Sequence, residues 1–170
     1  MQDLRGPFIV PYHILQSRFG RGLSEPAPLV ADRNGRMLGE CFSLLKNLLL
    51  ELANTNTQEW VKGESFFNQT GNPTNTLYKP SVTGAAIATF DENGKVYKST
   101  DPRSTHGAIF LFNAYGDVNG RRVPGFYVID QWTGQRLGKP SYAGIRFIGT
   151  VGASLRSNDA RAFSLVMLRK

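Results

Sequence analysis

Residues 39–48 read GECFSLLKNL, and this stretch predicts the best-marked helix in the 170-residue chain. Apolar side chains recur here and just beyond at steps of three and four residues, the pattern of a helix with one buried face. They are Phe42, Leu45, Leu48, Leu49 and Leu52. The pattern predicts a helix from about Gly39 to Ala53. Cys41, the single cysteine of the chain, therefore lies at or next to the first helical turn.

The position of Cys41 is compatible with two different roles. At a helix start, unpaired backbone N–H groups and the positive end of the helix dipole stabilise a negative charge on a cysteine sulfur. A backbone N–H of the first turn can also stabilise an oxyanion that forms beside the sulfur. A lone cysteine is, on the other hand, commonly a small buried apolar side chain. Further residues are needed to decide between a nucleophile and a core residue.

Two β-prone segments supply candidate partners for Cys41. His106 begins an apolar run at residues 106–112 that predicts a central strand, and Asp130 lies near the end of the next run, residues 125–132. If the two strands are antiparallel neighbours, the start of the first lies beside the end of the second, so His106 and Asp130 meet. Burying a carboxylate among apolar residues is costly unless a partner pairs with it. We therefore predict Cys41 as the nucleophile, His106 as the base and Asp130 as the residue that orients the imidazole.

Alternatives to this assignment follow from the same residues. A shift of one residue in strand register would bring Gln131 forward in place of Asp130, and its amide could also orient the ring. His106 considered alone is better explained as a strand-start histidine bonded to the backbone. Trp60, Gln131 and Trp132 are candidate substrate-binding residues. Packing of Trp60 beneath its loop is the alternative for that residue.

Length and composition predict one domain with a real core. No apolar run approaches the length that spans a membrane, and the first residues lack the apolar core of a secretory signal. We therefore expect synthesis in the cytoplasm without a signal peptide, and no membrane insertion. One cysteine excludes an intramolecular disulfide, and two histidines far apart in the sequence give no paired-ligand spacing. We predict no metal site and no cofactor.

The formal net charge of +7 is moderately basic. Lysine and arginine are scattered along the chain and form neither a dense tract nor a basic helix. This distribution favours attraction to a polyanion without readout of bases. Nucleic acid, anionic lipid and the acidic bacterial cell wall all qualify, although the partners that we predict include no nucleic acid. A basic surface that serves only solubility is equally consistent with it.

The rest of the chain predicts an α+β fold in which an N-terminal helix carrying the cysteine packs on an antiparallel β-sheet. Residues 1–37, which several prolines and glycines interrupt, predict an irregular N-terminal arm. Residues 38–170 form the core of a single catalytic domain that comprises residues 1–170. Within this core, residues 55–83 predict a long polar binding loop, and residues 113–124 predict a polar excursion between two strands.

A cysteine at a helix start, a histidine at a strand start and a polar residue one strand later is the layout of papain-like and NlpC-type amidases. An ordered series of motifs also resembles the type VI secretion amidase effectors, cysteine peptidases of the NlpC/CHAP-like group that cut bacterial peptidoglycan. The motifs are GECxxLxK at 39–46, WxxG at 60–63, GxAIATF at 84–90, DxxG at 91–94, HxAIFL at 106–111 and VxDQW at 128–132.

The resemblance implies that Cys41, His106 and Asp130 hydrolyse amide bonds in the peptide stems or cross-links of peptidoglycan, with the D-alanine–diaminopimelate bond as the expected target. It also implies delivery by the type VI secretion apparatus into the periplasm of a rival bacterium, and a cognate periplasmic immunity protein that protects the producer. Two other functions stay open. One is a papain-like cysteine protease with a protein target, and the other is a non-catalytic basic module that binds cell wall or another polyanion.

Overall fold

The computed structural model describes residues 3–19, 29–36, 40–78, 82–97, 105–132, 142–151 and 156–170, with only the backbone described for Trp132 and Tyr142. These residues form an α+β fold with one antiparallel sheet of seven strands, which is the predicted class. The strands are β1 (Leu4–Arg5), β2 (Trp60–Ser65), β3 (Ala86–Thr89), β4 (Gly107–Val118), β5 (Arg121–Trp132), β6 (Tyr142–Gly149) and β7 (Phe163–Arg169). The α-helices are α1 (Tyr12–Phe19), α2 (Cys41–Leu48) and α3 (Leu50–Ala53).

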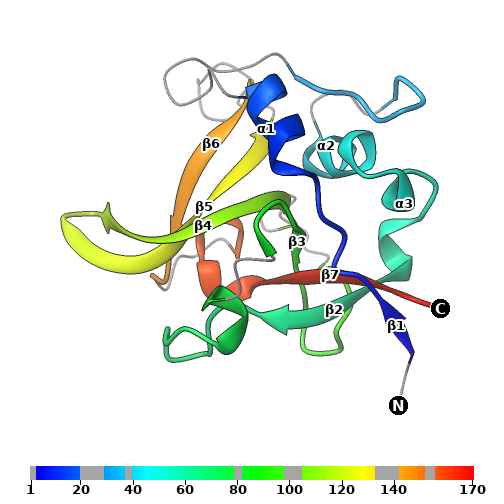
Figure 1. The fold of residues 1–170 in the computed structure, drawn as a ribbon. Helices are drawn as coiled ribbons and strands as arrows, with labels where there is room; N and C mark the ends of the chain where they lie inside the picture. Colours follow the sequence, from blue (N-terminus) through cyan, green and yellow to red (C-terminus); the bar gives the residue numbers. More distant parts are fainter. Residues whose placement is uncertain are drawn as a thin grey trace.

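The strands follow the order β1-β7-β3-β4-β5-β6, and β2 pairs with β7 as well. The last strand of the chain thus contacts β1, β2 and β3, so early and late parts of the sequence belong to one sheet. Figure 1 shows the two ends of the chain on the same side of the molecule. There, Lys170 Nζ lies 2.8 Å from Asp3 Oδ1.

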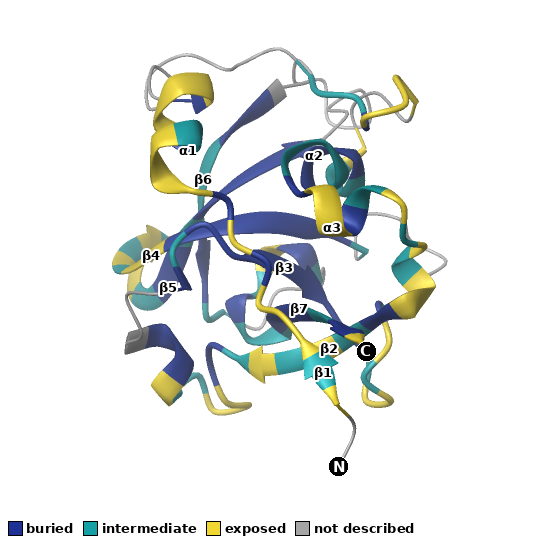
Figure 2. Cartoon of the chain, turned by 45° about the vertical axis from the view of Figure 1, so that its right-hand side comes forward, coloured by how far each residue is buried: buried dark blue, intermediate teal, exposed yellow. Residues whose placement is uncertain are grey.

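The sheet separates two apolar clusters, because successive residues of a strand point to opposite faces. Along β4, Ala108 and Phe110 belong to one cluster, whereas Ile109 and Leu111 belong to the other. The cluster of Ile109 also contains the buried apolar residues of α1, α2 and α3. In Figure 2 the central strands are buried, and the exposed residues of the helices face outward. The three helices therefore cover the same face of the sheet.

The predicted helix over residues 39–53 is divided in two. Leu49 has an extended backbone (φ −116°, ψ 110°), so α2 ends at Leu48 and α3 begins at Leu50. The interruption keeps Leu49 and Leu52 buried and places Leu50 on the surface. Among the described residues, no helix is long and apolar enough to cross a membrane.

Gly107, the first residue of β4, allows α2 to lie close to the sheet. A Cβ atom at this position would lie 2.7 Å from Cδ1 of Phe42 and 3.0 Å from Cδ1 of Leu45. α2 contacts both β4 and β5. The absence of a side chain at Gly107 thus brings Cys41, the first residue of α2, toward the start of β4.

The segment 113–124, predicted as a polar excursion, instead continues β4 and β5 into a long hairpin. Its turn is Asn119-Gly120, with φ angles of 53° and 76°. Two positive φ angles define a type I′ turn, for which Asn-Gly is a strongly favoured sequence. The hairpin extends well beyond the rest of the sheet (Figure 1). The polar residues that indicated a loop are therefore the exposed side chains of paired strands.

The first 37 residues, predicted as an irregular arm, contain β1 and α1 in their described part. The Pro11 carbonyl accepts the backbone N–H groups of Ile14 and Leu15 at the start of α1. Proline is compatible with a helix start, because the N–H that it lacks has no partner there. Leu15 and Phe19 lie four residues apart and are buried on one face of α1. The spacing of Leu15 and Phe19 is the sequence pattern that indicates a helix in this segment.

Residues 55–83, predicted as a long binding loop, contain β2, which pairs with β7. The exposure of residues alternates along β2, as expected of a strand with one covered face. The aromatic residues of this region, Trp60, Phe66 and Phe67, are buried. The segment therefore contributes to the sheet and the core rather than forming a simple surface loop.

Candidate active site

His106 and Asp130 lie together where β4 begins and β5 ends. The two strands are antiparallel, with Ile109 opposite Ile129, so the start of one lies beside the end of the other. His106 Nε2 is 2.8 Å from Asp130 Oδ2. Both side chains are buried, with 5% and 3% of their residues' surfaces exposed. A buried histidine is thus paired with a buried carboxylate at the position expected from the strand pattern.

Cys41 lies next to the His106 ring. It is a half-buried free cysteine and the first residue of α2. Its sulfur is close enough to the imidazole for its charge and a hydrogen bond to raise the pKa of His106, and Sγ also lies 4.0 Å from the Thr105 carbonyl oxygen. Because Nε2 of the ring faces Asp130, Nδ1 is the nitrogen left to face the sulfur. The three residues therefore form a series of sulfur, ring and carboxylate.

The backbone of His106 is held by Thr89 of β3. The N–H of His106 donates to Thr89 Oγ1 at 3.1 Å, and the N–H of Thr89 donates to the His106 carbonyl at 3.0 Å. The ring of Phe163 meets the imidazole edge to face, with 6.3 Å between the ring centroids. Backbone and ring contacts on neighbouring strands thus fix the orientation of the imidazole.

Arg146 of β6 also contacts Asp130, a contact not predicted from the sequence. Its Nε donates to Asp130 Oδ2 at 2.9 Å, and its Nη2 lies 2.7 Å from the same oxygen. Its guanidinium also donates to the Asn158 side chain at 2.7 Å and to the Ser157 carbonyl at 3.0 Å. The sequence feature that could have indicated a role for Arg146 is that it is the one charged residue in β6. Arg146 lies opposite Val128 and so shares the face of Asp130.

These contacts shift the pKa values of both buried groups. Burial alone would lower the pKa of His106, but the charge of Cys41 and the hydrogen bonds to Asp130 and Cys41 raise it from 6.5 to about 9. Burial alone would raise the pKa of Asp130, but the charge of Arg146 and the hydrogen bond from His106 lower it from 3.8 to about 2. At neutral pH the ring is therefore protonated and the carboxylate ionised. A protonated ring can donate from both nitrogens, one toward Asp130 and one toward the sulfur.

Gln131 points to the opposite face of β5 from Asp130, because neighbouring strand residues alternate. It is 1% exposed, and its Oε1 accepts the Val30 N–H at 2.9 Å. Its Nε2 donates to the carbonyls of Val30 and Glu40 at 2.7 Å. None of these hydrogen-bond partners is His106. Gln131, the alternative candidate for orienting the ring, therefore holds the segment around Val30 and the start of α2 instead. A buried amide that is bonded at both ends is also not placed to contact a substrate.

Comparison with known proteins agrees with this geometry. The model of the family domesticated amidase effector 2 (Dae2) matches residues 14–166, a range that includes Cys41, His106 and Asp130. The chain belongs to the Dae2 family. The resemblance to amidase effectors stated from the sequence motifs is thereby confirmed. No curated protein and no solved structure matches the chain.

We expect this Dae2-family protein to lose stability as the pH falls below about 4. The lowered pKa of Asp130 means that the unfolded chain takes up the proton first, so stability is present above pH 3.8 and is lost as the pH falls through about 2. The contribution is on the order of 2 kcal/mol. Urea unfolding between about pH 5 and 2 should show it, with a shallower dependence in Arg146→Gln because the cation nearest to Asp130 is removed. Parallel pH dependences of the two proteins would contradict this explanation.

The structure describes the side chain of one of the two candidate tryptophans of this Dae2-family protein, Trp60. Trp60 has no exposed surface, and its Nε1 donates to Thr55 Oγ1 at 2.8 Å. Its side chain therefore belongs to the core and has no surface to offer a substrate. For Trp132 the backbone is paired with Tyr142, and its expected substrate contact lies outside the described side chains.

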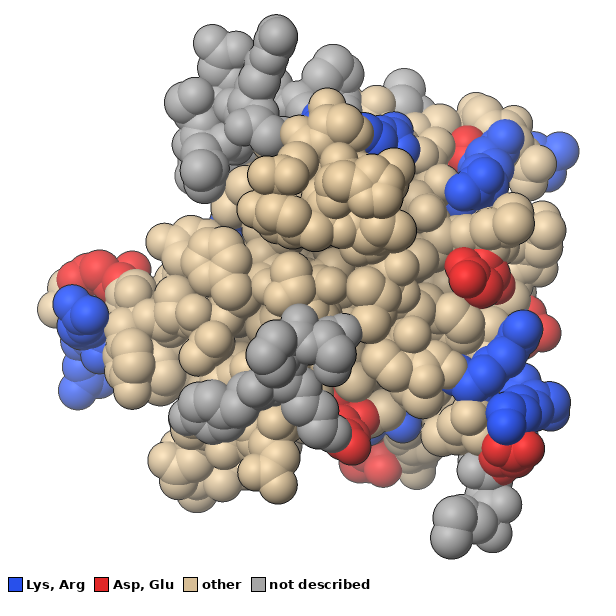
Figure 3. Space-filling view, viewed as in Figure 1, with Lys and Arg blue, Asp and Glu red and all other residues tan. Residues whose placement is uncertain are grey.

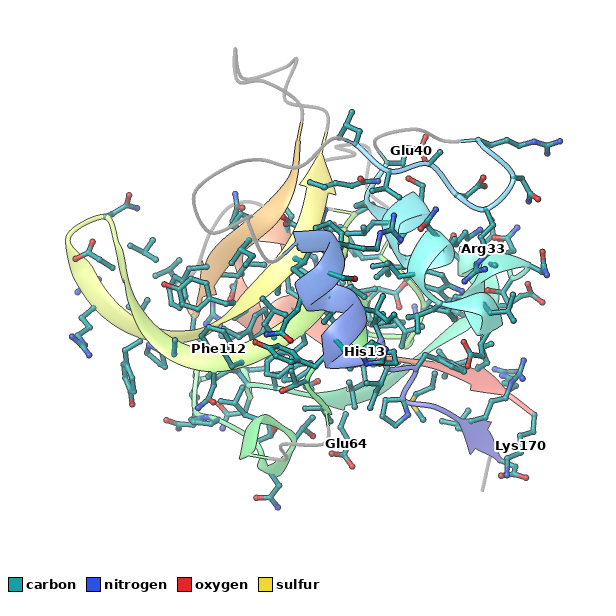
Figure 4. The ribbon with its side chains drawn as sticks, turned by 45° about the horizontal axis from the view of Figure 1, so that its top comes forward. His13, Arg33, Glu40, Glu64, Phe112 and Lys170 are labelled. Atoms are coloured by element: carbon teal, nitrogen blue, oxygen red, sulfur yellow. The ribbon has the colours of Figure 1, made fainter. Side chains whose placement is uncertain are left out.

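The second histidine and the acidic residues of the Dae2-family chain do not form a metal centre in the described segments. His13 is exposed on α1, apart from Glu40 at the start of α2 (Figure 4). No group of three or more histidine, cysteine, aspartate or glutamate residues within the described parts of the chain could hold a metal ion.

Charged side chains of both signs lie at the margins of the face shown in Figure 3, and the middle of this face is largely uncharged. The hairpin tip, for example, carries Asp117 beside Arg121 and Arg122. Attraction of a polyanion needs a continuous surface of one sign. The described part of this face offers no such surface, although the net charge of the Dae2-family chain is +7.

Proposed function

We propose that the protein is a cysteine amidase that hydrolyses amide bonds in the peptide part of bacterial peptidoglycan. The observation that carries the proposal is the half-buried Cys41 at a helix start, next to the His106 ring that Asp130 holds. Membership of an amidase effector family supports the reaction class. The helix-borne cysteine and the strand-borne histidine support a papain-like or NlpC-type site. The single catalytic domain then comprises residues 1–170.

In the proposed reaction, the proton of Cys41 is already held by the His106 ring, and the Cys41 sulfur attacks the amide carbonyl carbon. A C–S bond forms, and the tetrahedral oxyanion is stabilised by the Cys41 backbone N–H in the first turn of α2. The protonated His106 gives its proton to the amide nitrogen, the C–N bond breaks, and the amine leaves. Water then attacks the thioester while His106 takes one of its protons. The C–S bond breaks, and the acid product leaves the free cysteine.

Asp130 and Arg146 serve this reaction through the ring rather than by touching the substrate. The ionised carboxylate favours the protonated ring and fixes its tilt, and Arg146 keeps the carboxylate ionised. The ring must hold its proton until the amine departs, so a raised pKa of His106 suits the acid role at neutral pH. Trp132 stays a proposed substrate-binding residue at the end of β5.

We further propose the D-alanine–diaminopimelate cross-link as the bond that is cut. The protein would be delivered by a type VI secretion apparatus into the periplasm of a target bacterium. A periplasmic immunity protein of the producer would block the site around Cys41. Membership of an amidase effector family supports delivery to another cell. The proposed chemistry of the site does not depend on the delivery route.

Digestion of purified sacculi from a Gram-negative bacterium tests the proposal. We expect cross-linked muropeptide dimers to disappear and monomers to accumulate, with one water added per bond cut, as measured by liquid chromatography and mass spectrometry. Cuts within the stems rather than at the cross-link would support the amidase activity but would show that a different amide bond is hydrolysed. Unchanged muropeptides beside a cleaved protein would favour the papain-like protease. Sedimentation of the protein with undigested sacculi would favour a non-catalytic cell-wall module.

A further inference from the structure

We propose that Gln131 is a positioning residue that fixes the peptide group between Glu40 and Cys41, and with it the backbone N–H that faces the oxyanion. Asp130 and Gln131 are neighbours at the end of β5 and point to opposite faces of the sheet. Asp130 binds the base, His106, and Gln131 binds Glu40 at the start of α2, the helix that carries Cys41. The inference rests on the proposed function, because it takes Cys41 as the nucleophile.

The contacts of Gln131 converge on the residue that precedes Cys41. Its Nε2 donates to the Glu40 carbonyl at 2.7 Å, and Glu40 is the residue that caps α2. The Glu40 carbonyl and the Cys41 N–H belong to one planar trans peptide unit, in which the C=O and N–H bonds point in opposite directions. A donor held on the carbonyl side therefore directs the N–H away from β5. Donation to the carbonyl also polarises the unit and strengthens the N–H as a donor.

Ser43 completes the same arrangement from within α2. Its Oγ lies 2.9 Å from Gln131 Nε2, and its hydroxyl donates to the Glu40 carbonyl at 2.6 Å. The Ser43 N–H donates to that carbonyl as well, at 3.1 Å. Ser43 has no exposed surface and Gln131 has 1%. Buried donors from β5 and from α2 therefore meet at one carbonyl oxygen.

The contacts of Gln131 require both an acceptor and a donor, which an ionised carboxylate cannot provide. Gln131 Oε1 accepts the Val30 N–H at 2.9 Å, while its Nε2 also donates to the Val30 carbonyl at 2.7 Å. An ionised carboxylate here would have only acceptors and would face the two carbonyls of Val30 and Glu40. A protonated carboxyl group would again have one acceptor and one donor. The chemistry of this site therefore distinguishes an amide or acid from a carboxylate.

The variant Gln131→Glu tests the proposal through its pH dependence. At about pH 5 the buried side chain is expected to be protonated and to replace the amide, so the rate of Cys41 alkylation and kcat should be close to those of the native protein. Toward pH 8 both should fall by about tenfold or more relative to the native protein, with KM unchanged. The titratable and charged groups on the packed elements are present in both proteins. They are Glu40, Cys41 and Lys46 at α2, Asp32, Arg33 and Arg36 on the segment of Val30, His106 before β4, and Arg146 on β6.

Three further measurements separate positioning from folding. The exposed Gln58 provides a matched control, because Gln58→Glu makes the same change away from the site and should leave the pH profile as it is. Ser43→Ala should lower kcat without changing KM. The amide ¹⁵N–¹H signal of Cys41 should shift in Gln131→Glu as the pH rises and should not shift in Gln58→Glu.

Equal alkylation rates for Gln131→Glu and the native protein at pH 8, with an unshifted Cys41 amide signal, would overturn the inference. So would a Gln131→Met variant that keeps the native kcat. Alkylation and the amide signal do not depend on peptidoglycan. A failure of the proposed substrate would therefore appear in the sacculus digestion and leave these two readouts in place.

Discussion

Replacement of Cys41 by alanine is expected to abolish peptidoglycan hydrolysis and to leave the fold intact. The chain has no second cysteine, so no other thiol can replace the nucleophile. Loss of a nucleophile that acts as a unit with its base lowers kcat by about 10⁴-fold or more. The residue is half-buried at the first position of α2, and removing one sulfur atom there should change the free energy of unfolding by about 1 kcal/mol or less. Release of muropeptides and toxicity after direction to a periplasm should therefore vanish together.

The same variant carries an internal check that the sulfur is next to the ring. The charge of Cys41 is a main cause of the raised pKa of His106. In Cys41→Ala, an NMR titration of the imidazole should therefore show a pKa below the value of about 9. Hydrolysis that persisted in a folded Cys41→Ala protein would end the thiol mechanism. An unchanged imidazole titration would instead show that the sulfur does not act on His106.

The strand pattern was sufficient to bring His106 and Asp130 together. Apolar runs of ordinary strand length, an antiparallel pairing and the alternation of side chains place these residues at one end of the sheet, and the structure has them 2.8 Å apart. The helix that carries Cys41 was also predicted, except for its interruption at Leu49. Local periodicity therefore carried most of this information.

Partners supplied by other parts of the chain could not be read in the same way. Arg146 reaches Asp130 because β6 pairs with β5, and Gln131 reaches Glu40 because the segment around Val30 lies over the start of α2. Neither contact can be predicted from a local sequence pattern, because each joins residues far apart in the chain. Trp60 illustrates the opposite case. Trp60 was a candidate substrate-binding residue with packing beneath its loop as the alternative, and tertiary packing buries it completely.

In the hairpin of β4 and β5, the sequence contained a turn signal, but the polarity of the surrounding residues led to the prediction of a loop. Residues 113–124 are polar, and polarity predicted a loop. The Asn-Gly pair at 119–120 is nevertheless a strong hairpin signal, because both residues tolerate positive φ angles. Exposed strands are polar on the side that faces water, so turn chemistry was the better guide here than mean polarity.

The variant Asp130→Asn is expected to have the second largest effect. Asp130 lies between two cations, the protonated ring of His106 and the guanidinium of Arg146. An amide of the same size keeps the shape and one acceptor but removes the charge that compensates them. Leaving buried charges without compensation costs about 3–5 kcal/mol of the free energy of unfolding. Because Asp130 helps to raise the pKa of His106, the ring should also lose its proton at a lower pH.

Activity in Asp130→Asn should therefore fall by about 10²- to 10⁴-fold near neutral pH, and the high-pH limb of the kcat profile should move to lower pH. Asp159→Asn is the matched control, because Asp159 pairs with Arg161 at 2.7 Å and makes no described contact with His106. It should keep the native kcat profile and lose little stability, since this pair is more exposed. Urea unfolding and a kcat profile between about pH 5 and 10 would measure both effects. A native profile in Asp130→Asn would remove Asp130 from the mechanism and leave a pair of Cys41 and His106.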